Sequence, residues 1–225
     1  IGQEQMKQRP IESLYKAYVY ANEQAKNNET IALQARQYFQ QLEQGNCSAE
    51  ILHNWSLYRK YTVDELSGMY QRLGVQFDCY DWESQYSQQQ IQQVIQALQQ
   101  HGLLHPEEDG RQVVLVGNRR VPVIKSDGST LYLSRDIAAL LDRFERFQFD
   151  RILYVVDNGQ TDHFNACFQT AAALSQDVPL SKLQHVKFGR IHGMSTRQGK
   201  VVFLKDVLDE ARDIMLEKQH NSTSE

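Results

Sequence analysis

Three polar side chains stand where predicted strands give way to helices, and together they could bind a cation. Tyr132 lies in a predicted strand at 131–133, Asp136 lies at the start of the following helix, and Gln160 comes just after a strand that ends at Val156. Ligands of open α/β sheets collect beyond the carboxyl ends of the strands. A guanidinium has five donors and no acceptor, so a carboxylate with a hydroxyl and an amide oxygen near it suits such a ligand. From residue types alone, the simpler interpretation of Asp136 is a first-turn acid that complements the helix dipole.

Two further side chains near these positions could contact an anion. Arg135 could bind a phosphate, or it could form a salt bridge with a nearby acid such as Asp136 or Asp142. His163 stands at the start of a predicted helix, where its imidazole could contact a nucleotide or simply pair with the backbone. For Arg135 and for His163, the sequence does not decide between the two alternatives.

The segment from Gly193 to Lys200 combines glycines, hydroxyls and cations. Ser195 and Thr196 supply hydroxyls, and Arg197 and Lys200 supply positive charge. Glycines permit unusual backbone angles, and cations can meet charge that develops on a leaving pyrophosphate. The segment could therefore close over a triphosphate, although a plain hairpin turn has the same composition.

The first part of the chain has the periodicity of a run of helices over residues 10–74. Pro10 can occupy the first turn of one helix, and Ser48 can cap another. A capping-box pattern at residues 62–65 predicts that a separate helix starts near Thr62 and ends before Gly74. Ser87 begins a further helix, whose apolar stripe is formed by Ile91, Val94, Ile95 and Leu98.

After residue 112 the period changes to that of strands. A strand, a helix and a second strand follow one another at 152–156, 162–174 and 184–188, which predicts a βαβ unit with a right-handed crossover. The sheet is then expected to be parallel at its core, with a final helix from Val207. The other predicted strands are 113–116, 121–124, 131–133 and 201–204, with a tight turn at 126–129 and a helix that starts at Ser134.

The bulk composition excludes several classes of protein. A formal net charge of −4 argues against nonspecific binding to nucleic acid, so any RNA contact must be local. The three cysteines are far apart and form no Cys-x-x-Cys pair, which fits a reducing compartment and offers no metal site. No apolar run is long enough to span a membrane, and the residues from Ile1 onwards do not have the pattern of a targeting segment.

Four ordered blocks resemble the second half of the catalytic domain of arginyl-tRNA synthetases, which are class I enzymes. The blocks are FDCYDWESQY at 77–86, YLSRD at 132–136, GQTDHF at 159–164, and QHVKFGRIHGM at 184–194, which runs into the Gly193–Lys200 segment. The sequence of residues 157–160, Asp-Asn-Gly-Gln, is closer to the mitochondrial branch of this family than to the cytosolic branch. The resemblance covers nearly the whole chain.

The resemblance implies a role for each candidate. Tyr132, Asp136 and Gln160 match the residues that hold the substrate arginine in the family. The segment after Gly193 resembles the Lys-Met-Ser-Lys-Ser loop but has Gly193 and Thr196 where the two lysines would stand. The implied ATP-binding residues are His163, Gly193, Met194, Ser195 and Thr196, and the implied catalytic residues are Arg197 and Lys200.

The resemblance also implies a reaction and its partners. Arginine would be activated by ATP with Mg²⁺ to an arginyl-adenylate and then transferred to its tRNA, with no covalent enzyme intermediate. The expected location is the mitochondrial matrix, with the cytoplasm as second choice, and the expected state is a monomer. The chain contains no His-x-Gly-His, so we expect a fragment that is inactive in isolation.

The expected fold is α/β, a Rossmann-like parallel sheet preceded by a mainly helical insertion. The insertion would occupy residues 1–110, the catalytic half 111–219, and a polar tail 220–225. An alternative is a noncatalytic nucleotide- or arginine-binding module derived from a class I synthetase. A His-x-Gly-His motif encoded upstream of Ile1 would distinguish the two.

Overall fold

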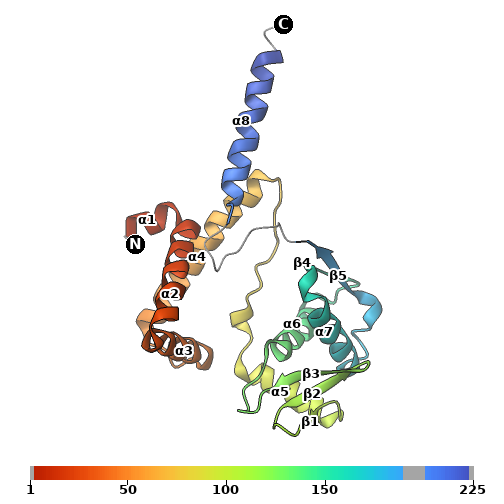
Figure 1. Ribbon diagram of the computed structural model, residues 1–225. Helices are drawn as coiled ribbons and strands as arrows, with labels where there is room; N and C mark the ends of the chain where they lie inside the picture. The colour runs from red at the N-terminus through yellow and green to blue at the C-terminus, as the bar shows by residue number, and fades with distance from the viewer. Residues whose placement is uncertain (1–2, 190–200, 223–225) are drawn as a thin grey trace. The chain divides into compact units, whose positions relative to one another are not determined.

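The computed structural model describes residues 3–189 and 201–222. The contacts divide the chain into two compact units (Figure 1). Residues 1–80 and 191–225 form one unit, and residues 81–190 form the other. The mixed α/β class expected from the sequence is confirmed, and helices α1 to α5 precede the first strand.

The described part of the first unit consists of helices. Asn28 and Ser48 cap two of them, since their side-chain oxygens accept hydrogen bonds from the backbone of the following turn. Pro10 occupies the first position of its helix, as predicted. The helices are α1 (Gln3–Gln8), α2 (Pro10–Asn27), α3 (Glu29–Gln44), α4 (Ala49–Arg72) and α8 (Leu204–Ser222).

The prediction of a helix start near Thr62 is wrong, because α4 runs without interruption through this position. The Thr62 hydroxyl donates to the carbonyl of Tyr58, one turn earlier, and so does not cap a new helix. The helix ends as predicted before Gly74, which has a left-handed φ of +70°. The helix thus continues through the capping-box pattern at residues 62–65.

The second unit contains the strands and the shorter helices. Ser87 forms the predicted capping box with Gln90 at the start of α5. The helices are α5 (Gln88–Gln100), α6 (Tyr132–Phe147) and α7 (Thr161–Leu174), with short 3-10 turns η1 (Glu83–Gln85), η2 (Asn158–Gln160) and η3 (Leu180–Lys182). The strands are β1 (His105–Pro106), β2 (Gln112–Val116), β3 (Arg119–Ile124), β4 (Ile152–Asp157) and β5 (Leu183–Phe188).

The strands form two separate sheets. β4 and β5 pair in parallel, from Ile152 opposite Leu183 to Asp157 opposite Phe188, with α7 between them in sequence. The predicted βαβ unit is therefore confirmed. The expectation of a parallel pairing at the core is met by β4 and β5, whereas β1, β2 and β3 form a separate antiparallel sheet.

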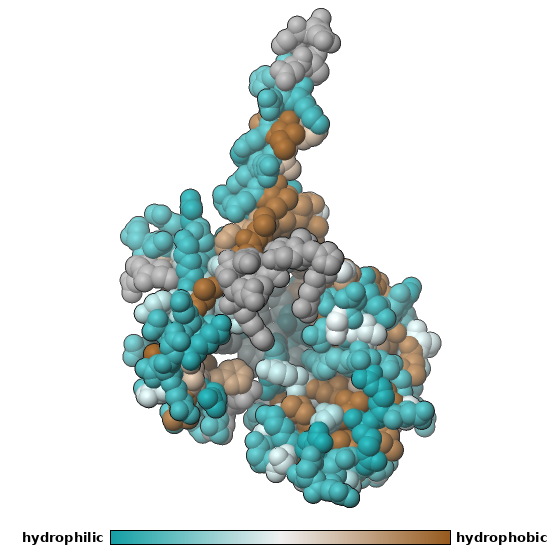
Figure 2. Space-filling model, viewed as in Figure 1, coloured by the Kyte–Doolittle hydropathy of each residue, from teal (hydrophilic) through white to brown (hydrophobic). Residues whose placement is uncertain are grey.

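Two predicted strands are absent from the described residues. Residues 131–133 are not a strand, because only an isolated bridge joins Ile124 to Thr130 and α6 already begins at Tyr132. Residues 201–203 have no regular structure, and Leu204 begins α8. The final helix itself is confirmed, but Val207, Ile214 and Met215 remain exposed along it. Figure 2 shows apolar residues at the surface of α8.

The core of the second unit lies where α5, α6 and α7 meet the strands. The predicted stripe of α5 is buried, and Leu98 is completely inaccessible. Ile137 and Leu140 of α6 are also completely buried in this cluster. Although α5 precedes residue 110, where the predicted domain boundary lies, it packs against α6 and belongs to the unit that starts at Asp81.

Replacing a core side chain of α6 should destabilise this unit. We expect Ile137→Ala to lower the free energy of unfolding by about 2–5 kcal/mol, because the site loses apolar contacts and cannot collapse fully. Leu115→Ala is the matched control, since Leu115 is 52% exposed on β2 and should change stability by roughly 0.5 kcal/mol or less. Urea unfolding followed by circular dichroism measures both. Equal losses of unfolding free energy in the two variants would contradict the placement of Ile137 in the core.

Candidate active site

The first two turns of α6 carry two of the predicted binding residues on one face. Tyr132 and Asp136 are four positions apart, which places them one above the other on a helix. Tyr132 is 63% exposed, and the Asp136 side chain is 39% exposed. Ile137, the next residue along, is completely buried. The helix therefore buries one face and presents a hydroxyl and a carboxylate on another.

The segment after β4 carries the third predicted residue. The Asp157 carboxylate accepts a hydrogen bond from the backbone of Gly159, and the Thr161 hydroxyl donates to the carbonyl of Asn158. These bonds hold the turn η2 between the strand and α7. Gln160 is the residue just before α7 and is exposed. Its amide group thus lies at the helix start, beyond the carboxyl end of β4.

One hydrogen bond joins α6 to α7 at this place. His163 Nε2 lies 2.5 Å from Asp136 Oδ2, and both side chains are partly exposed. When the imidazole is protonated, this contact is a charge-assisted hydrogen bond, which is stronger than a neutral one. The structure therefore brings Asp136 together with His163. His163 lies in the first turn of α7, three positions after Gln160. The second ring nitrogen of His163, Nδ1, makes no hydrogen bond within the described part of the chain.

Arg135 forms a salt bridge, but not with the acids that the sequence suggested. Its Nη1 lies 2.6 Å from Oε1 of Glu83 in the turn η1. The expected partners Asp136 and Asp142 instead bond to His163 and Arg146. Glu83 lies far away in sequence, so no local pattern pointed to it.

Sequence reasoning missed a second charged cluster, which is centred on Asp81. Its carboxylate accepts hydrogen bonds from Arg143 Nε at 2.6 Å, from Arg146 Nη2 at 2.8 Å, and from the Tyr86 hydroxyl at 2.8 Å. Burial alone would raise the pKa of Asp81, but the bonds from Arg143, Tyr86 and Arg146 hold this pKa well below its usual range. The spacing of Arg143 and Arg146 on one helix face was the available signal.

Tyr154 of β4 is partly buried, and Cys167 of α7 is completely buried. Burial raises the pKa of Tyr154 to about 12, and burial also raises the pKa of the Cys167 thiol far above its usual range. Both groups are therefore neutral at physiological pH, and Cys167 offers no thiolate nucleophile. Among residues 3–189 and 201–222, no cluster of three histidine, cysteine or acidic side chains is arranged to bind a metal ion. No described helix is long and apolar enough to cross a membrane.

The remaining predicted site residues lie outside the described residues. They are Gly193, Met194, Ser195, Thr196, Arg197 and Lys200. Nothing in the described structure therefore bears on the nucleotide-closing segment.

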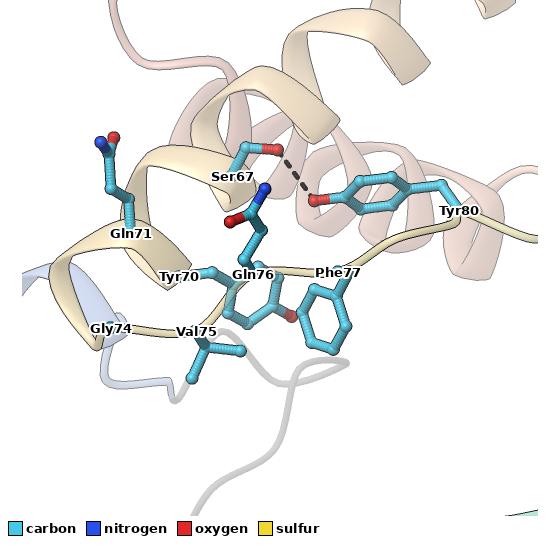
Figure 3. Close-up of a pocket in the computed structure, with 8 residues that line it drawn as sticks. All are labelled: Ser67, Tyr70, Gln71, Gly74, Val75, Gln76, Phe77 and Tyr80. Atoms are coloured by element: carbon cyan, nitrogen blue, oxygen red, sulfur yellow. Dashed lines mark hydrogen bonds between the residues drawn. The ribbon is translucent and has the colours of Figure 1, made fainter.

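A cavity of about 540 Å³ lies in the first unit, between the end of α4 and the segment that follows it (Figure 3). The Ser67 and Tyr80 hydroxyls are 2.9 Å apart, and the rings of Tyr70 and Phe77 meet edge to face. Among the described residues that line it, none carries a carboxylate, imidazole, amine or guanidinium. It therefore lacks the groups that acid–base chemistry near neutral pH or guanidinium recognition needs.

The low pKa of Asp81 links the stability of the second unit to pH. A lowered folded-state pKa stabilises the protein fully above the unfolded value, near pH 4, and this contribution is lost as the pH falls toward the lowered value. We expect Asp81→Asn to lower the free energy of unfolding at pH 7 by about 3 kcal/mol, since it leaves two arginines without their carboxylate. The difference from wild type should shrink below pH 4.

Urea unfolding at several pH values tests this expectation. Asp109→Asn is the control, because Asp109 pairs with Arg111 at an exposed turn of the same unit and should change stability little. A loss in Asp81→Asn that stays constant from pH 7 to pH 3 would contradict the assigned linkage.

Known proteins resemble this chain along nearly all of its length. It is 40% identical over 220 residues to "Probable arginine--tRNA ligase, mitochondrial" of Bos taurus, which covers 96% of this chain and 37% of that protein. It is 34% identical over 219 residues to "Arginine--tRNA ligase, cytoplasmic" of Saccharomyces cerevisiae, covering 92% of this chain and 36% of that protein. The chain thus spans little more than a third of the length of these relatives.

The fold agrees with solved structures as well. The arginyl-tRNA synthetase of Plasmodium falciparum superposes with a TM-score of 0.63 at 22% identity, over 87% of this chain and 34% of that one. The family model described as "tRNA synthetases class I (R), catalytic domain" matches residues 1–224. The resemblance inferred from the four sequence blocks is therefore confirmed, and the chain belongs to the family of class I (R) tRNA synthetase catalytic domains.

Proposed function

We propose that the protein containing this chain ligates arginine to its tRNA with ATP, through an arginyl-adenylate. The observation that carries this proposal is the carboxylate of Asp136, which is partly exposed and bonded to His163 where α6 meets α7. Membership of the class I (R) family supports the reaction. The relatives named as arginine–tRNA ligases support the amino acid.

Asp136 binds the guanidinium of arginine in this proposal. A carboxylate offers about four lone-pair sites, so its two oxygens can accept from His163 and from a guanidinium at once. The Tyr132 hydroxyl, on the same face of α6, and the Gln160 amide oxygen, at the start of α7, accept further guanidinium donors. Acceptors around a planar cation favour arginine over lysine, because lysine lacks the fork of donors.

The nucleotide lies on the side of His163 that faces away from Asp136. Nδ1 of His163 contacts ATP, and Gly193, Met194, Ser195 and Thr196 of the closing segment bind it as well. The arginine carboxylate attacks the α-phosphorus of ATP, and pyrophosphate leaves with its Mg²⁺. Arg197 and Lys200 stabilise the charge on this leaving group, so catalysis consists mainly of positioning and electrostatic stabilisation.

The proposal also divides the chain by role, with a helical insertion over residues 1–110, a Rossmann-like catalytic half over residues 111–219 and a polar tail over residues 220–225. In this division the insertion includes α5, which packs in the compact unit that starts at Asp81, and α8 extends into the tail. The protein acts as a monomer on tRNA(Arg) in the mitochondrial matrix in this proposal. The mitochondrial relatives in Bos taurus and Homo sapiens support the location. The cytoplasm is the second choice, since a cytoplasmic relative is also similar.

Neutralising Asp136 should weaken arginine recognition selectively. In the full-length protein, we expect Asp136→Asn to raise the KM for arginine by roughly 30-fold or more, because loss of one partner of a desolvated charge pair costs about 2–5 kcal/mol. The KM for ATP should change by less than about twofold. Arginine-dependent pyrophosphate exchange measures both constants.

Asp150→Asn provides the control for a general charge effect, because Asp150 is exposed in the loop between α6 and β4. This variant should behave as wild type. Equal rises in both KM values for Asp136→Asn would indicate a folding defect and would refute the binding role.

Removing the cation at Arg197 should affect the chemical step more than binding. We expect Arg197→Ala to lower the rate of arginine activation by roughly 100-fold, because the contact is made chiefly to charge present in the transition state. The KM for arginine should rise far less. Gln198→Ala is the control within the same segment, and an unchanged activation rate in Arg197→Ala would show that the segment is an ordinary hairpin.

A further inference from the structure

Residues 81–86, named here the strap, are bonded to both ends of α6. Glu83 forms a salt bridge with Arg135, which lies in the first turn of the helix. Asp81 forms salt bridges with Arg143 and Arg146, which lie in the last two turns. One short segment thus contacts the helix that carries Tyr132 and Asp136 near its start and near its end.

The strap is itself held in one conformation. Tyr86 is 5% exposed, and its hydroxyl donates to Asp81 and lies 3.3 Å from Asp142. The side chain of Gln85 also bonds to Asp81. The carboxylate of Asp81 is therefore fixed before it meets the two arginines, so little side-chain entropy remains to be lost.

The same network reaches the other side of the candidate site. Arg143 Nη1 donates to the Tyr154 hydroxyl at 3.1 Å, and Tyr154 belongs to β4. The Tyr154 ring packs against Phe164 and Phe168 of α7. Asp81 therefore binds an arginine of α6 that also bonds to the βαβ unit, which carries Gln160 and His163.

The buried part of α6 combines large and small side chains. Leu133, Ile137 and Leu140 are buried and fix the rotation of the helix, whereas the buried Ala138 and Ala139 are small and form only shallow ridges. Directional bonds at both ends add resistance to sliding of the helix along its axis. A displacement of about 1 Å at a binding group can cost orders of magnitude in rate.

We propose that Asp81 and Glu83 are positioning residues for arginine recognition, which they support by holding α6 so that Asp136 meets the guanidinium. This inference rests on the proposed binding role of Asp136. Neither Asp81 nor Glu83 touches the substrate. Their effect should therefore appear in arginine binding, should spare ATP binding, and should depend on the presence of Asp136.

The test uses Glu83→Gln and Asp81→Asn in the full-length protein. Glu83 has a side chain that is 58% exposed, so Glu83→Gln should fold even if Asp81→Asn does not. The control is Glu107→Gln, since Glu107 forms a comparable salt bridge with Arg120 on the antiparallel sheet of the same unit. Pyrophosphate exchange gives the KM values for arginine and ATP, and thermal unfolding gives Tm.

Each strap variant should raise the KM for arginine by roughly fivefold to tenfold and should change the KM for ATP by less than about twofold. The control should leave both constants unchanged. In an Asp136→Asn background, the strap variants should add less than about twofold to the KM for arginine, because the carboxylate they position is gone. The decreases in Tm caused by Asp136→Asn and by each strap variant should still add in the double variant.

Two results would overturn the inference. A lowered Tm with an unchanged KM for arginine in both variants would assign the strap to stability alone. A full multiplicative effect in the Asp136→Asn background would show that the strap does not act through Asp136. If Asp136→Asn alone left the KM for arginine unchanged, the proposed function would fail together with the inference. If Asp136→Asn raised this KM but neither strap variant did, only the inference would be refuted.

Discussion

Burial of one face of α6 is the constraint on which the candidate site depends. Leu133 and Ile137 are four positions apart and are buried in the core of the second unit, and this fixes the rotation of the first turns of the helix. With 3.6 residues per turn, the same rotation leaves Tyr132 and Asp136, each one position earlier, partly exposed to solvent. The hydrophobic core thus determines which polar groups are presented, and the salt bridges of the strap then refine where they lie.

Local signals in the sequence predicted many elements correctly. The capping box at Ser87, the proline at position 10 and the βαβ pattern act within a few residues or one supersecondary unit, and each is found as expected. The signal at Thr62 is equally local but failed, because the α-helix continued through it. The strand predictions at 131–133 and 201–204 also failed, because α6 already begins at Tyr132 and α8 at Leu204.

The sequence suggested candidate site residues, which stay a prediction, but it did not indicate their partners. Gln160 follows the parallel strand β4, where an α/β fold places ligands, whereas Tyr132 and Asp136 lie in the first two turns of α6 and were chosen because their types suit a cation. The bonds that organise them cross 27 positions, from Asp136 to His163, and 52 positions, from Glu83 to Arg135. Asp81 was missed for the same reason, because an acid in a segment without regular structure becomes informative only when two arginines meet it.

A structure of the full-length protein with arginine bound tests the central claim most directly. The account predicts that the guanidinium lies within hydrogen-bonding distance of the Asp136 carboxylate, the Tyr132 hydroxyl and the Gln160 amide oxygen, with His163 still bonded to Asp136. A guanidinium held by other residues, with Asp136 bonded only to His163, would contradict it.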